Sequence, residues 1–182
     1  MALTFDQLKA LVAAEGLRFF IDPDACRLML GVTGMCGKFQ LVISLYEEGN
    51  FLQFRSVNYL CCPAGHRSLP EVLKAIADIN YQARLVKFAW DQSDGEIVAY
   101  ADAWIMDGTL TQGQLSRMIS NYVPVIDMQF YRLEKTIKEG KDPGRIDPAT
   151  LMARLAAESS LPPELRALVE GKKGDGGGVD TV

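Results

Sequence analysis

The amino-acid sequence predicts an α+β domain in which helices pack on an antiparallel β-sheet. Three segments repeat their apolar residues at helical spacing, and the segments between them alternate apolar and polar residues as half-buried strands do. The strand segments come in runs joined by short turns, and single helices separate the runs. This pattern differs from the regular strand–helix alternation of a parallel sheet. The expected element order is therefore α-β-β-β-β-α-β-β-α.

Three helix starts carry the signature of a capping box, a hydroxyl residue followed three positions later by Glu or Gln. The pairs are Thr4 with Gln7, Ser68 with Glu71, and Thr111 with Gln114. An apolar stripe follows each pair, and the longest stripe runs from Leu115 to Ile137. Pro124 lies inside this stripe, so we expect a kink there or a break into two helices.

The strands are expected at residues 17–22, 25–33, 37–46 and 51–61, followed by a hairpin of residues 85–91 and 96–105 around the turn QSDG. The breaks DPDA, TGMCG and EEGN between the first four strands are short and rich in turn residues. Neighbouring strands are therefore expected to pair in antiparallel fashion.

The composition changes after residue 139, which divides the chain into three parts. Residues 1–139 form the α+β domain, 140–170 a linker with short C-terminal helices, and 171–182 a disordered tail. Two apolar stripes lie in the middle part: Leu151, Met152 and Leu155, then Leu165, Leu168 and Val169. Neither helix is long enough to persist alone in water, so each is expected to dock on an apolar surface.

Composition and charge exclude several classes of function. The 182 residues are 48% hydrophobic and 23% charged, with a net charge of -4, which is enough apolar material for a core and too little basic charge for a nucleic-acid binder. The first residues lack the pattern of a secretory leader, and no segment has the apolar length of a membrane helix. We expect a cytoplasmic protein with four reduced cysteines, no nucleic-acid partner, no membrane contact and no cofactor.

The segment NYLCCPAGHRS holds Cys61, Cys62 and the only histidine, His66. A metal site would need a fourth ligand such as Cys26 or Cys36, and zinc sites space their cysteines so that both sulfurs converge. Adjacent cysteines on a strand point to opposite faces instead. A Cys–His nucleophile would need a third group to orient the imidazole, and none identifies itself. The simpler interpretation is a strand end, a turn and an exposed His66 before a helix.

Two further patterns fit turns better than catalysis. The segment GVTGMCGK does not match the spacing of a phosphate-binding loop, because Phe39 stands where Ser or Thr is required, and it predicts a hairpin turn. The carboxylates Asp91, Asp94 and Glu96 lie in or beside the QSDG turn, where Asp commonly stabilises the backbone.

The aromatic residues of the last hairpin are the candidate binding residues. Trp90, Tyr100 and Trp104 are large, flat side chains that fill a core or form a contact surface. Tyr100 and Trp104 share one face of their strand, opposite Ile97 and Ala99. We name Trp90, Tyr100 and Trp104 as possible partner-binding residues.

The second half of the domain resembles the YbjN family, small bacterial proteins labelled sensory transduction regulators. The matching elements are Ile79–Asn80, the hairpin VKFAWDQSDGEIVAYADAWI, the helix entry DGTLTQGQL and Asp127. The resemblance implies a fold like that of type III secretion chaperones, an antiparallel sheet with helices that commonly forms dimers.

Two functions remain open from the sequence. The favoured one is a non-enzymatic interaction module, regulatory or chaperone-like, that acts through an apolar surface as a homodimer or on a protein partner of unknown identity. The alternative is a thiol- or metal-dependent enzyme that uses Cys61 or Cys62 with His66. The scarcity of convergent polar residues favours the first.

Overall fold

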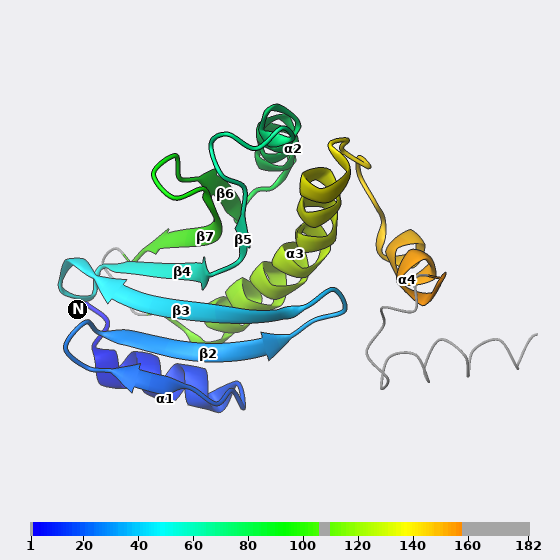
Figure 1. The fold of residues 1–182 in the computed structure, drawn as a ribbon. Helices are drawn as coiled ribbons and strands as arrows, with labels where there is room; N and C mark the ends of the chain where they lie inside the picture. Colours follow the sequence, from blue (N-terminus) through cyan, green and yellow to red (C-terminus); the bar gives the residue numbers. More distant parts are fainter. Residues whose placement is uncertain (1, 106–109, 158–182) are drawn as a thin grey trace, which may run out of the picture.

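The computed structural model of this chain describes residues 2–105 and 110–157 (Figure 1). Its helices are α1 (Phe5–Ala14), α2 (Leu69–Gln82), α3 (Gln112–Glu139) and α4 (Pro148–Ala157), with a short 3₁₀ turn η1 at Glu47–Gly49. Its strands are β1 (Phe20–Asp22), β2 (Arg27–Thr33), β3 (Lys38–Tyr46), β4 (Phe51–Val57), β5 (Leu60–Cys61), β6 (Lys87–Trp90) and β7 (Glu96–Trp104).

The strands form one antiparallel sheet, which confirms the predicted α+β class. The order is β1-β2-β3-β4-β7-β5, with β6 paired to β7. Both β4 and β6 pair with Tyr100 of β7, so they lie on opposite sides of that strand. The helices α1 and α3 pass behind the strands in Figure 1. The sheet therefore has one face covered by helices, here called the inner face, and an opposite outer face.

The predicted strand of residues 51–61 is interrupted. Asn58 adopts a left-handed φ of 52°, and the chain resumes pairing with β7 as β5. The interruption turns Tyr59 into the core, where it is buried and its hydroxyl donates a hydrogen bond of 2.6 Å to the Ile126 carbonyl. The first predicted strand is also shorter than expected, since regular pairing begins only at Phe20.

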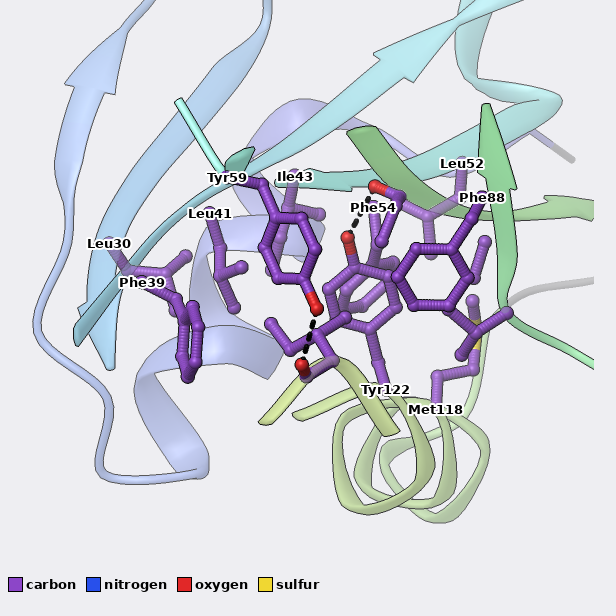
Figure 2. Packing of buried hydrophobic residues seen from close by; sticks show 14 of the residues in the cluster. Leu30, Phe39, Leu41, Ile43, Leu52, Phe54, Tyr59, Phe88, Met118 and Tyr122 are labelled. Atoms are coloured by element: carbon purple, nitrogen blue, oxygen red, sulfur yellow. Dashed lines mark hydrogen bonds between the residues drawn. The ribbon is translucent and has the colours of Figure 1, made fainter. Parts of the chain in front are cut away.

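The core lies between the inner face and the helices (Figure 2). Side chains such as Leu41, Ile43 and Phe54 project from the sheet toward Tyr122 of α3. The Tyr122 ring is fully buried, and its hydroxyl donates to the Ala99 carbonyl at 2.6 Å. Because a buried hydroxyl needs a partner, this bond fixes the depth at which α3 sits against the sheet.

Two of the three predicted capping boxes are confirmed. Thr4 and Thr111 accept hydrogen bonds from the backbone amides of Gln7 and Gln114, whose side chains bond back to the caps. The prediction of a capping box at Ser68 is wrong, because the Ser68 side chain makes no capping hydrogen bond. Ser68 already has helical backbone angles, and its hydroxyl donates to the Ile137 carbonyl at 2.9 Å instead. The hydroxyl thus ties the start of α2 to the end of α3.

The expected break at Pro124 does not occur, and the long helix is not divided there. The helix α3 is continuous from Gln112 to Glu139, with Pro124 on its exposed side. A proline removes one backbone hydrogen bond. The fully buried Tyr122 and Ile126 on either side of it hold both halves of the helix against the sheet. Tertiary packing therefore outweighs the local preference.

An ion-pair network joins α3 to α2 and to the linker that precedes α4. The buried Arg132 guanidinium contacts Asp142 at 2.6 Å and Asp78 of α2 at 2.9 Å. Beyond this linker, Leu151 and Leu155 of α4 are buried in a small cluster with Tyr131. The first apolar C-terminal stripe therefore docks on its own chain. The second stripe and the predicted tail of residues 171–182 lie outside the described residues.

Candidate protein-interaction surface

The outer face of the sheet is built from parallel rows of side chains that the strand register defines. Residues paired across antiparallel strands project to the same side. One row contains Phe20, Met29, Val42, Arg55, Tyr100 and Lys87. The next row is polar and contains Asp22, Arg27, Ser44, Gln53 and Asp102. Apolar side chains and charges of both signs thus share one continuous face.

A third row at the end of the sheet is entirely aromatic. It joins Tyr46, Phe51 and Trp104, with ring centroids 6.3 Å apart for the first pair and 4.9 Å for the second. Trp104 remains 63% exposed and Phe20, in the first row, 79% exposed. Solvent exposure of large apolar side chains on one face is typical of a surface that binds another molecule.

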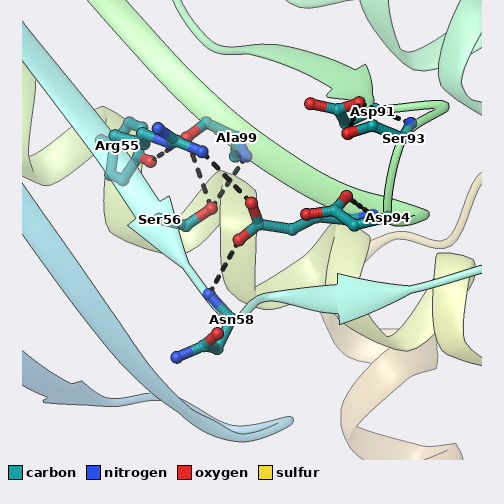
Figure 3. Close-up of polar contacts among 9 residues, drawn as sticks. Arg55, Ser56, Asn58, Asp91, Ser93, Asp94 and Ala99 are labelled. Atoms are coloured by element: carbon teal, nitrogen blue, oxygen red, sulfur yellow. Dashed lines mark hydrogen bonds and ion pairs between the residues drawn. The ribbon is translucent and has the colours of Figure 1, made fainter.

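The outer face is hollowed over part of these rows. Figure 3 shows three residues of the lining, Arg55, Asn58 and Asp94. The hollow has a volume of about 710 Å³, and its lining comes from β2, β3, β4, β5, β7 and the β6–β7 turn. Its polar wall is held by Glu96, which accepts a bond from the Arg55 guanidinium at 3.2 Å and another from the Asn58 amide at 3.1 Å. Half of the Arg55 side chain is exposed, so the pair contributes little to stability and remains available to a ligand.

The structure separates the three aromatic residues that the sequence singled out. Tyr100 and Trp104 lie on the outer face, in different rows. Trp90 pairs with Ile97, which places it on the inner side, and its indole N–H donates to the Cys62 carbonyl at 2.8 Å. This bond ties the hairpin to the segment before α2, and a partner-binding role of the half-buried Trp90 stays a prediction. The partner-binding role of Tyr100 and Trp104 stays a prediction.

The structure places the residues of the enzyme alternative in different surroundings. Cys61 is exposed and donates to the Asp94 carbonyl at 3.6 Å, whereas Cys62 points into the core. Burial raises the pKa of the Cys62 thiol, which opposes nucleophilic activation. His66 is half-buried rather than exposed, and its Nδ1 accepts the Ser68 amide at 3.2 Å. Across residues 2–105 and 110–157, no three His, Cys, Asp or Glu residues are placed to hold a metal ion.

The two predicted turns are confirmed. The segment GVTGMCGK forms the β2–β3 turn, in which the Gly34 amide donates to the Gly37 carbonyl at 2.8 Å. In the QSDG turn, Asp91 accepts from Ser93 and Asp94 accepts from the Glu96 amide. The carboxylates of these two aspartates are used to hold the backbone.

Sequence reasoning missed most of the outer face. Phe20, Tyr46, Phe51 and Arg55 are not among the residues predicted from the sequence, although Tyr46, Phe51 and Arg55 each lie next to a buried apolar residue on their strand. The alternation could have marked them as outward-facing. Which of them become neighbours depends on the register between strands, which the alternation does not reveal.

These observations define the class of protein: an α+β domain with one helix-covered sheet face and one open, partly aromatic face. The chain belongs to the YbjN family, whose model, described as "Putative bacterial sensory transduction regulator", matches residues 4–135. The predicted family is therefore confirmed. Among curated proteins, none matches this chain.

Solved structures resemble the fold. The crystal structure of YbjN from E. coli is similar at 19% sequence identity, with a TM-score of 0.56, over 75% of this chain and 93% of that one. A chain of the heterodimeric ExoU–SpcU complex from the type III secretion system of Pseudomonas aeruginosa is similar at 22% identity, with a TM-score of 0.49, over 71% and 97%. A chain of the HopA1–SchA chaperone–effector complex is similar at 14% identity, with a TM-score of 0.47, over 67% and 90%.

A helix that spans a membrane must be both long and apolar. Within the part of the chain that the structure describes, no helix meets both requirements.

Proposed function

We propose that this chain is a non-enzymatic protein-interaction module, regulatory or chaperone-like, that works in the bacterial cytoplasm. Its binding surface is the outer face of the sheet, and the occupant of that face is a second copy of the chain. The homodimer so formed is the functional unit, built from the domain of residues 1–139.

The observation that carries this proposal is the contrast between the two faces of the sheet. The inner face is filled by side chains of α1, α2 and α3. The outer face keeps Phe20 and Trp104 largely in water, close to a hollow of about 710 Å³. Burying a large apolar side chain is favourable by about 2 kcal/mol, so the exposed rows supply a driving force for association.

The charges of the outer face favour a second copy as the occupant. A two-fold symmetric interface brings the same patch together from both subunits, so the patch must complement itself. The polar row carries Arg27 between Asp22 and Ser44, and it ends at Asp102. With both signs in one row, rotation about a two-fold axis can set Arg27 of one subunit against an aspartate of the other.

The test is sedimentation of the full chain at roughly 50 µM, a concentration at which a micromolar dimer is populated. The wild type is expected to sediment as a dimer, twice its 20.1 kDa mass. The double variant Phe20→Ser, Trp104→Ser removes the two most exposed large apolar side chains of the face and is expected to sediment as a monomer.

The matched control is Tyr81→Ser. Tyr81 is 89% exposed and belongs to α2, outside the three rows of the outer face. The control is expected to remain dimeric, because it removes an exposed aromatic ring without touching the proposed interface. A monomeric wild type, or a double variant that stays dimeric, contradicts the proposal.

A further inference from the structure

A second hollow lies on the other side of the sheet, between β2 and α3. Its volume is about 550 Å³, and its lining is mostly apolar, with Leu30, Leu41 and Phe54 from the sheet and Ile119 and Val123 from α3, next to the hydroxyl residues Thr33 and Ser120. None of its lining residues carries a charge. We call it the β2–α3 groove. A hollow of this kind accepts apolar side chains and rejects charged ones.

The groove adjoins the place where α4 docks. The α4 residues Leu151 and Leu155 pack beside Met35 and Met128. Met35 is two positions from Thr33, which lines the groove, and Met128 is four positions, about one helical turn, from Pro124, which also lines it. The described chain therefore ends, at Ala157, close to one end of an apolar groove.

The sequence after Ala157 has the apolar pattern that such a groove requires. Leu161, Leu165, Leu168 and Val169 fall on one side at helical spacing, and Arg166 and Glu170 fall on the opposite side. Pro162 and Pro163 suit the first turn of a helix. Residues 158–160 can span about 10 Å when extended, which gives Leu161 reach beyond the end of α4.

We propose that residues 161–169 bind in the β2–α3 groove of their own chain. The first C-terminal stripe already docks in this way through Leu151 and Leu155. The second stripe then continues along α3 and covers the groove, while its charged residues stay in water. The C-terminal segment thus seals the remaining apolar surface on the helix side of the sheet. The outer face is untouched, so the inference is independent of the proposed dimer.

The test is photo-cross-linking in the full chain. Ser120 is exposed on α3 and lines the groove, so its replacement by p-benzoylphenylalanine places a reactive ketone beside the proposed occupant without opening the core. Illumination is expected to give cross-links within one chain, mapped by mass spectrometry to residues 161–169. The same replacement at Asn121, an exposed neighbour that does not line the groove, is the control site and is expected to give few of them.

A pair of segment variants tests the contact from the other side. Leu165→Asp with Leu168→Asp removes two apolar anchors and is expected to reduce the cross-link yield from Ser120 about tenfold or more. Val179→Asp adds a charge outside the stripe and is expected to leave the yield unchanged. Cross-links from Ser120 only to other regions, cross-links only between two chains, or an unchanged yield in the double variant would each overturn the inference.

Discussion

Asp127 shows how one buried carboxylate fixes a turn that is distant in sequence. It is 5% exposed on α3, and its two oxygens accept the backbone amides of Met35 at 2.6 Å and Cys36 at 2.8 Å. The same environment acts on the thiol, because burial and the nearby Asp127 charge raise the pKa of Cys36 to about 12. The raised pKa keeps the Cys36 thiol protonated near neutral pH, which opposes nucleophilic reactivity.

Gly34 and Asp127 are expected to be energetically coupled. A Cβ added at Gly34 would lie 2.3 Å from the Asp127 carboxyl carbon, so Gly34→Ala forces the carboxylate away from its two amides. We expect Asp127→Ala to lower the free energy of unfolding by about 3 kcal/mol, because the hydrogen bonds to the charged carboxylate are lost. Gly34→Ala should lower the free energy of unfolding by about 2 kcal/mol, because the new Cβ clashes with the Asp127 carboxylate.

In the double variant the two costs should not add, because alanine at 127 leaves room for the new Cβ. Urea unfolding of the four proteins measures the coupling as a double-mutant cycle. Costs that add within experimental error would show that Asp127 does not hold the turn.

At the scale of elements, the sequence predicted the segments that have internal periodicity. Its predictions were wrong where a contact with a residue distant in sequence determines the local structure. The helices at Thr4 and Thr111 follow from local capping, and the structure has both. Ser68 is different, because its hydroxyl bonds to Ile137, 69 positions away. Pro124 is accommodated by packing on the sheet, and the interruption at Asn58 accompanies the burial of Tyr59. None of these contacts leaves a local signal.

The linker between α3 and α4 is expected to loosen in acid. The hydrogen bond from the Arg132 guanidinium is the largest cause of the lowered pKa of Asp142. The same guanidinium also lowers the pKa of Asp78. A carboxylate with a depressed folded pKa contributes stability above its unfolded pKa of about 3.9, and this contribution is lost as the pH falls through the folded pKa.

Asp142→Asn removes that titration and should flatten the loss of stability below about pH 4. Urea unfolding across this pH range is the measurement, and Asp24→Asn, at an exposed turn position, is the control. An unchanged pH dependence in Asp142→Asn would refute the role given to the ion pair.

At the scale of the whole molecule, the two faces of the sheet differ in how far they could be predicted. The inner face follows from alternation, because alternate residues of β2, β3 and β4 point inward and all of these except Ser56 are apolar. The outer face is a product of register. Tyr46, Phe51 and Trp104 come from three strands and become one aromatic row only after pairing. The single hairpin on which the sequence prediction concentrated supplies only part of this surface.

The central claim is that the outer face is covered when two chains associate, and Trp104 reports on it directly. The chain has two tryptophans, so Trp90→Phe leaves Trp104 as the only one, and circular dichroism checks that the variant is folded. Acrylamide quenching of its fluorescence is measured from about 0.5 to about 50 µM protein, a range that shifts a micromolar dimer by mass action. The account predicts that quenching weakens as concentration rises, because Trp104 becomes buried between subunits. Quenching that stays equally strong over the whole range, even where sedimentation detects a dimer, would contradict it.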